Sequence, residues 1–353
     1  MKGLIIIFFS LLLFVACKQQ HQSNHTGVIL IANGRMPSIT KDGMEVIHIV
    51  YGTGDSIMYT SSNNKGISFS SPELIDSLKG LVAYATRGPQ IAATRGGVAI
   101  IAVNKSGDIF SYVKDQTNRW IKTQRVNDAD TIDKEGFLGL SSDNENNLFA
   151  IWTDLRNDHR NKIFGARSMD GGKSWQKNIL VYASPDHNIC ECCKPSVVMK
   201  KNNVFVMFRN FLDGNRDLYM IQSANKGETF GKAQKLGKGS WALNGCPMDG
   251  GSLALNDKGS VQTVWRRQSK IYSCEPGGEE KIIGEGRGCG IETIGNKNIY
   301  AWSENGNIIC LLPDGSTRTI GVGSLPLLKS VSGNEVIFIW ANDTRIESYV
   351  LHL

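Results

Sequence analysis

The chain has 353 residues and a formal net charge of +6, with 38 glycines and only 9 prolines. Its basic residues are scattered and form no run interleaved with aromatic residues, which excludes nucleic acid as an expected partner. Beyond residue 16 no apolar stretch approaches the roughly 20 residues that cross a bilayer, which excludes an internal membrane span.

The N-terminus predicts export. Lys2 precedes an apolar run over residues 3–16, and Cys17 follows directly. A basic start, a short apolar run and small residues before a cleavage point are typical of a signal peptide. The cysteine resembles that of a bacterial lipobox. We expect residues 1–16 to be a lipoprotein signal peptide, Cys17 to be lipidated and residues 17–26 to be a polar tether. This places the chain in the bacterial cell envelope, at the outer membrane or cell surface, held to the membrane through the lipid anchor only.

Residues 27–353 repeat one pattern of short β-branched and aromatic runs bounded by Gly, Asn, Asp and Ser, as strands are. Each unit contains an apolar second strand, expected at residues 45–51, 97–103, 148–152, 204–208, 260–265, 298–302 and 335–340. A third strand follows, at residues 57–61, 109–113, 162–168, 217–223, 270–274, 307–312 and 345–351. We therefore predict an all-β domain: a single β-propeller of four-stranded antiparallel blades.

The favoured number of blades is seven, and six is the alternative because the two C-terminal units are short. The last unit lacks a fourth strand, which residues 27–32 would supply. Such closure removes exposed sheet edges.

Three turn motifs recur with the period of these units. Residues 168–175 read S-x-D-x-G-x-x-W, and residues 62–69 and 223–230 read S-x-N-x-G-x-x-F. Asp or Asn caps its own backbone in such a turn, and glycine supplies a positive φ. The last two motifs start 55 residues apart, at Ser168 and Ser223, and the first two about twice that distance apart. Trp120 lies close to the aromatic position of a degenerate copy. The motifs resemble the Asp-box, or BNR, repeats of the sialidase superfamily.

Propeller geometry places the loops before first strands and after second strands on one face, opposite the Asp-box turns. That face receives many cations and a few carboxylates, which suits an acidic glycan or another small anionic ligand, because arginine grips carboxylates with two hydrogen bonds. The candidate substrate-binding residues are Arg35, Arg87, Arg209, Arg266 and Arg267. Lys194 reaches the same face.

The resemblance implies a glycoside hydrolase. Sialidases hold the substrate carboxylate with three arginines, the first in an R-I-P motif that Arg35-Met36-Pro37 resembles. They also use a Tyr–Glu nucleophile and an Asp acid/base, for which Tyr51, Asp154, Asp249 and Glu304 are candidates by position. The implied activity is that of an exo-sialidase acting on acidic glycans. Sialidases have six blades, however, and the count favoured here is seven.

Seven cysteines follow Cys17, an odd number that cannot all pair within one chain. The geometry gathers soft ligands at one sector of the same face: Cys190, Cys192, Cys193, Cys246, Met248 and Cys289, with His187 close in sequence. One interpretation is disulfides that pin these loops, as the compartment favours. The other is a copper or zinc site, since both metals prefer sulfur ligands.

The cysteines leave a second functional class open: a non-catalytic propeller that binds a glycan, a protein or a metal. A lyase or another glycosidase is a third. Cys274 and Cys310 fall in third strands, where we expect them to be structural.

Overall fold

The structure is a computed structural model that describes residues 27–130, 133, 135–186 and 188–353. The predicted signal peptide, Cys17 and the tether lie outside the described residues, and so does His187. Within the described part of the chain, all regular secondary structure is β-strand, so no helix there could span a membrane.

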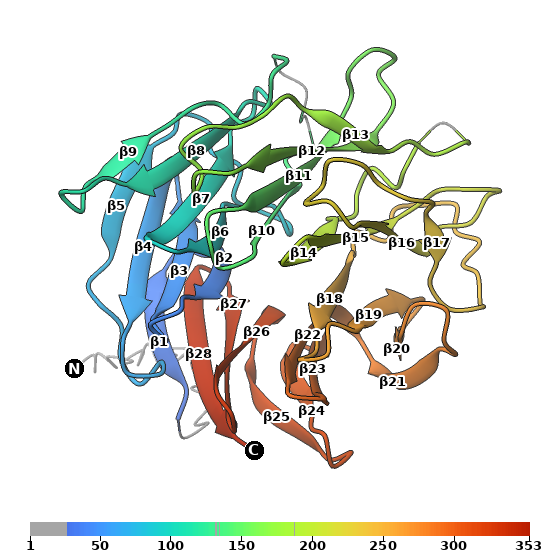
Figure 1. Ribbon diagram of the computed structural model, residues 1–353. Coiled ribbons are helices and arrows are strands. Elements are labelled where there is room, and N and C mark those ends of the chain that lie inside the picture. Colours follow the sequence, from blue (N-terminus) through green and yellow to red (C-terminus); the bar gives the residue numbers. More distant parts are fainter. Residues whose placement is uncertain (1–26, 131–132, 134, 187) are drawn as a thin grey trace, which may run out of the picture.

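Seven four-stranded antiparallel sheets follow one another along the chain. They fan around a central axis in the order of the sequence (Figure 1). The first blade consists of β2 (Arg35–Lys41), β3 (Ile47–Thr53), β4 (Ser56–Ser62) and β5 (Glu73–Ser77). The all-β propeller is thus confirmed, with the favoured seven blades and not six.

The next five blades repeat this meander, with first strands of neighbouring blades in contact around the axis. Blade 2 contains β6 (Gln90–Thr94), β7 (Gly97–Val103), β8 (Ile109–Lys114) and β9 (Trp120–Lys122); blade 3, β10 (Leu138–Ser142), β11 (Leu148–Asp154), β12 (Lys162–Ser168) and β13 (Ile179–Tyr182); blade 4, β14 (Ser196–Lys200), β15 (Asn203–Arg209), β16 (Leu218–Ser223) and β17 (Gln234–Lys235); blade 5, β18 (Gly251–Leu255), β19 (Val261–Arg267), β20 (Lys270–Cys274) and β21 (Lys281–Glu285); blade 6, β22 (Arg287–Ile294), β23 (Lys297–Glu304), β24 (Asn307–Leu311) and β25 (Thr317–Val322).

The ring closes through the N-terminal strand. Blade 7 consists of β26 (Ser324–Ser332), β27 (Glu335–Asn342) and β28 (Arg345–His352), and β1 (Ile29–Asn33) adds its outer strand. Figure 1 shows blue β1 beside red β28. Both ends of the propeller chain are therefore held in one sheet, and the closure expected of residues 27–32 is confirmed.

The core lies between blades, where second strands are buried on both faces. Trp152, Trp265, Trp302 and Trp340 stand near the ends of four of these strands and are at most 2% exposed. Trp302 and Trp340 lie against glycines in the fourth strand of the preceding blade, where a Cβ would not fit. Tyr51 holds the same position in blade 1, against Gly34. It is 1% exposed and serves as an inter-blade core residue.

The three Asp-box-like turns share one hydrogen-bond scheme. In residues 168–175, Ser168 Oγ donates to Asp170 Oδ1 (2.8 Å) and accepts from the Gly172 amide (2.9 Å). The Ser174 amide donates to Asp170 Oδ1 (2.9 Å). Residues 62–69 and 223–230 repeat these bonds. In blade 2, Asp115 accepts from the amide four residues on, and Trp120 follows at the aromatic position. That turn retains the acid and the aromatic without the serine and glycine.

Each complete turn also joins two blades. Its glycine has a positive φ and lies against the second strand of the preceding blade: Gly66 against Ile337, Gly172 against Ala99 and Gly227 against Phe149. The turns are therefore structural.

Candidate site at the mouth of the propeller

Strand register defines the end of the propeller where a site could form. In blade 3, the start of β10 pairs with the end of β11, Leu138 opposite Trp152. The turn that begins at Ser168 lies at the other end, because Ser168 is opposite Leu148. The loops that lead into first strands, here called the mouth loops, therefore surround the axis at the end away from the Asp-box-like turns.

Two cavities of about 140 and 370 Å³ open at this mouth. They adjoin, because Thr86, Asp249, Gly288 and Leu325 line both. A third cavity of about 470 Å³ follows the axis between the first strands, and we call it the tunnel.

The mouth loops are strained. Met36, Thr86, Met248 and Leu325 line the mouth cavities, and each has a positive φ between 51° and 70°. A side chain in this left-handed region costs about 1 kcal/mol or more. Such strain persists where the surroundings impose it and gathers at ligand sites. Positive φ also occurs in turns elsewhere in the ring, but four such residues around two adjoining cavities make the mouth the best candidate site on this propeller.

Lys194 stands between the mouth and the tunnel and lines both. Its Nζ donates to Gln90 Oε1 (3.0 Å), which links the mouth loop of blade 4 to the start of β6 in blade 2. Burial lowers the pKa of Lys194 to about 8, so the ammonium remains mostly protonated at pH 7. No carboxylate of the described residues lies within ion-pair distance, and even a partly buried cation is costly without a counter-ion. The group suits an anionic ligand.

Asp249 is the carboxylate of the mouth and is 4% exposed. Its Oδ2 pairs with Arg266 Nε (2.7 Å) and accepts from the Gly288 amide (3.2 Å). Burial raises the pKa of Asp249, and the Arg266 guanidinium opposes that rise. Arg209, 1% exposed, donates to the backbone carbonyls of Asp249, Arg216 and Arg266. Both guanidiniums therefore hold the blade 5 mouth loop in place.

The other three predicted arginines have other surroundings, although Arg267 lines a small pocket together with Arg209. Arg87 pairs with Glu135 (3.3 Å) and lies over the Phe137 ring at 4.0 Å. Arg267 forms two hydrogen bonds with Glu280, at 2.9 and 2.5 Å. Arg35 is exposed at the start of β2. The five arginines thus do not converge on one point, and most already have protein partners.

Of the four predicted catalytic residues, only Asp249 lines either mouth cavity. Asp154 is fully buried, pairs with Arg156 (2.8 Å) and accepts from Trp152 Nε1 (2.8 Å). Glu304 accepts from Trp302 Nε1 (3.4 Å) in the same way. In both blades a carboxylate two residues after the core tryptophan satisfies its indole. Tyr51 lies in the core described above.

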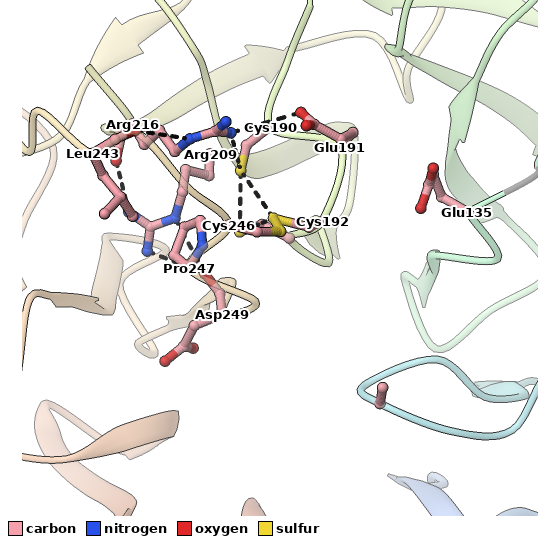
Figure 2. The surroundings of a disulfide bond; sticks show 12 residues. Glu135, Cys190, Glu191, Cys192, Arg209, Arg216, Leu243, Cys246, Pro247 and Asp249 are labelled. Carbon is pink, nitrogen blue, oxygen red and sulfur yellow. Dashed lines mark hydrogen bonds and ion pairs between the residues drawn. A yellow bond between two sulfur atoms is a disulfide. The ribbon is translucent and has the colours of Figure 1, made fainter. Parts of the chain in front are cut away.

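Four of the six predicted soft ligands gather in what we call the sulfur cluster: Cys190, Cys192, Cys193 and Cys246. Cys192 and Cys246 form a disulfide between the mouth loops of blades 4 and 5 (Figure 2). For this pair the structure therefore has the disulfide interpretation and not metal ligation. Cys190 and Cys193 are free and buried. Hydrogen bonding with Cys193, assisted by Arg216, lowers the pKa of Cys190.

The remaining predicted ligands lie outside the sulfur cluster. Cys289 lines the smaller mouth cavity, where burial raises its pKa, and Met248, 41% exposed, lines the larger. Cys274 and Cys310 are buried in β20 and β24.

Two residues of the site were not predicted from the sequence. Gln90 follows the Gly-Pro pair of its mouth loop, and that position could have indicated it. Arg216 contacts Cys190 from the connection between β15 and β16. Nothing in the sequence signals that contact.

No family model and no curated protein matches the chain. Among solved structures, the BP39L lectin from Burkholderia pseudomallei is 10% identical with a TM-score of 0.67, and the alignment covers 91% of this chain and 96% of the lectin. The GH93 α-L-arabinofuranosidase of Fusarium graminearum is 11% identical with a TM-score of 0.51, covering 92% and 97%. NanB, a sialidase from Streptococcus pneumoniae, is 12% identical with a TM-score of 0.50, covering 94% of this chain and 71% of NanB. The chain is thus a sialidase-like propeller in fold.

Proposed function

We propose that this protein binds an acidic glycan at the mouth of the propeller and does not hydrolyse it. The observation that carries the proposal is Lys194, a cation on the floor of the mouth without a carboxylate partner among the described residues. A ligand carboxylate would supply the missing counter-ion. Charge-assisted hydrogen bonds of this kind are stronger than neutral ones.

The uncharged groups that line the smaller mouth cavity also suit a sugar. Gln90, Ser196 and Ser252 offer hydrogen-bonding groups, and Met36 and Pro326 offer apolar surface. Ligand sites usually combine apolar walls with a few polar groups that fix orientation. The similar structures include a lectin, which binds carbohydrates, and glycosidases, which act on them. This similarity supports the same class of ligand here.

The carboxylates favour binding over hydrolysis. Glycosidases use a pair of carboxyl groups about 5–10 Å apart across the scissile bond. Among the described residues lining the mouth cavities, Asp249 is the sole carboxylate, and Arg266 already pairs with it. Lipidation at Cys17 would hold this binding surface at the cell envelope.

The test compares binding of sialylated, uronic and neutral oligosaccharides by calorimetry. We expect acidic ligands to bind, and Lys194→Met to weaken them about 30-fold or more, because the ligand charge loses its partner. Lys297→Met, at an exposed position at the opposite end of blade 6, is the matched control. Equal binding by Lys194→Met and wild type would contradict the proposal.

Hydrolysis is the second candidate, because the chain resembles NanB and the GH93 α-L-arabinofuranosidase in fold. A fluorogenic sialoside and an arabinofuranoside incubated with folded protein distinguish the two functions. Turnover that Asp249→Asn abolishes would replace binding by hydrolysis as the function of the mouth.

A further inference from the structure

The sulfur cluster has the spacing of a metal site. Cys190 Sγ lies 3.3 Å from Cys193 Sγ and 3.6 Å from Cys192 Sγ, and the latter two sulfurs are 4.0 Å apart. In a tetrahedral thiolate site, metal–sulfur bonds of about 2.3 Å place neighbouring sulfurs about 3.8 Å apart. The three distances bracket that value. Cys246, bonded to Cys192, supplies the fourth sulfur.

The charges around the sulfur cluster suit anionic sulfur. Figure 2 shows Arg209 and Arg216 on the same side of the sulfurs. Arg216 Nη1 donates to Cys190 Sγ (3.1 Å). Arg209 is buried, and its hydrogen bonds go to backbone carbonyls, with no ion pair to a carboxylate of the described residues. Four thiolates around one monovalent or divalent cation carry a net negative charge. Arg209 would offset part of it, and Arg216 would do so beside its ion pair with Glu191 at 3.6 Å. Neutral thiols would leave Arg209 with only the Asp249 carboxylate, which forms no ion pair with it, as a counter-charge.

The disulfide controls access to this set. Cys246 is exposed, whereas Cys190, Cys192 and Cys193 are buried. A thiolate of a dithiol reductant can attack Cys246 Sγ, form a mixed disulfide and release Cys192 as a thiolate. The second thiol of the reductant then attacks the mixed disulfide and releases the Cys246 thiolate. The reductant leaves as a disulfide, and the Cys192–Cys246 bond has been reduced by two electrons.

We propose that the reduced sulfur cluster binds one thiophilic d¹⁰ cation, copper(I) or zinc, through Cys190, Cys192, Cys193 and Cys246. Thiolates are the ligands these ions prefer. The ion would replace the disulfide as the link between the mouth loops of blades 4 and 5. None of these four cysteines lines the mouth cavities, so the site is distinct from the proposed glycan site, although Lys194 directly follows Cys193 in the chain.

The experiment uses the mature full-length chain, reduced with a phosphine without oxygen and freed of reductant. Copper(I) or zinc is added beside a competing chelator, and metal per chain is measured by mass spectrometry after gel filtration. We expect one ion per reduced chain and at least about tenfold weaker retention by the oxidised chain. For copper(I), a thiolate-to-copper charge-transfer band should appear in the ultraviolet.

Cysteine variants locate the ion. Cys190→Ser and Cys193→Ser, each checked for folding by circular dichroism, are expected to weaken retention at least tenfold. Cys274→Ser and Cys310→Ser, at buried cysteines of third strands, are the matched controls and should retain the ion as wild type does. If the controls alone lose metal, or if Cys190→Ser and Cys193→Ser both retain it fully, the assignment is overturned.

Two further outcomes decide the proposal. A reduced chain that rejects both ions and simply re-forms the Cys192–Cys246 bond overturns it, and the disulfide is then a structural tether. Lys194→Met should bind metal normally whatever happens to its glycan binding, so failure of either proposal can be recognised by itself.

Discussion

The two ends of the propeller are built on opposite plans. At one end, three turns repeat the same Ser–Asp/Asn–Gly hydrogen bonds and pack against the preceding blade. At the mouth the blades differ: the blade 4 loop carries Lys194 and Cys192, a disulfide joins Cys192 to the blade 5 loop, and a buried arginine at the end of β15 lies beside them. The groups that repeat from blade to blade serve the packing of blades against each other. The groups that occur in one blade only are candidates for the site at the mouth.

The comparison also separates two kinds of charge at the mouth. Arg209 and Arg266 have fixed protein partners, whereas Lys194 has one neutral partner. The two arginines stabilise the mouth loops, whereas the lysine is available to a ligand. Four predictions test these distinctions, in order of the expected change in stability.

Arg209→Ala should give the largest loss, about 3 kcal/mol or more in the free energy of unfolding, because buried carbonyls of three residues lose a charged donor. The exposed Arg95, paired with Glu145 at 3.7 Å, is the control, and Arg95→Ala should cost less than about 0.5 kcal/mol. Urea unfolding measures both. Similar losses would mean that the guanidinium of Arg209 does not hold the mouth loops.

Gly227→Ala should cost about 2–4 kcal/mol. The backbone there has a φ of 79°, and an added methyl group meets the Phe149 ring of the preceding blade. Gly214→Ala is the matched control, since its φ of 74° is similar and nothing lies within 4 Å. It should lose only about 1 kcal/mol from backbone strain. The difference between the two variants measures how strongly an Asp-box-like turn joins its blades.

Lys194→Met should leave unfolding stability unchanged or raise it by about 1 kcal/mol, because it removes a desolvated charge without a counter-ion. Thermal unfolding without ligand checks this. A loss of more than about 1 kcal/mol would show that Lys194 is a structural member of the ring, which would weaken its assignment to a ligand.

The smallest effect concerns His48, which contacts Tyr59 (2.7 Å) and Asp42 (3.1 Å) in blade 1, with Lys114 nearby. Burial lowers the pKa of His48 despite the Asp42 carboxylate. Below about pH 6.5 the unfolded chain therefore gains a proton that the folded chain does not, and stability falls as pH drops. His48→Gln should have a shallower decline between pH 7.5 and 5.5. An equal decline in both proteins would assign it to other groups.

The sequence by itself determined the ring. Strand periodicity, the three turn motifs and the unpaired N-terminal strand are local patterns, and together they predicted seven closed blades and the end where the mouth lies. Turn chemistry acts within about eight residues, so it can be recognised without the fold.

Only the tertiary structure decided which mouth residues are available. Tyr51, Asp154 and Arg267 have the residue types of a glycosidase site, yet each already has a partner within the ring. Tyr51 packs against Gly34, Asp154 accepts a hydrogen bond from the Trp152 indole, and Arg267 pairs with Glu280. The Cys192–Cys246 bond and the contact of Arg216 with Cys190 join segments 54 and 26 residues apart. Burial and pairing depend on what the rest of the ring brings alongside, and no local pattern encodes that.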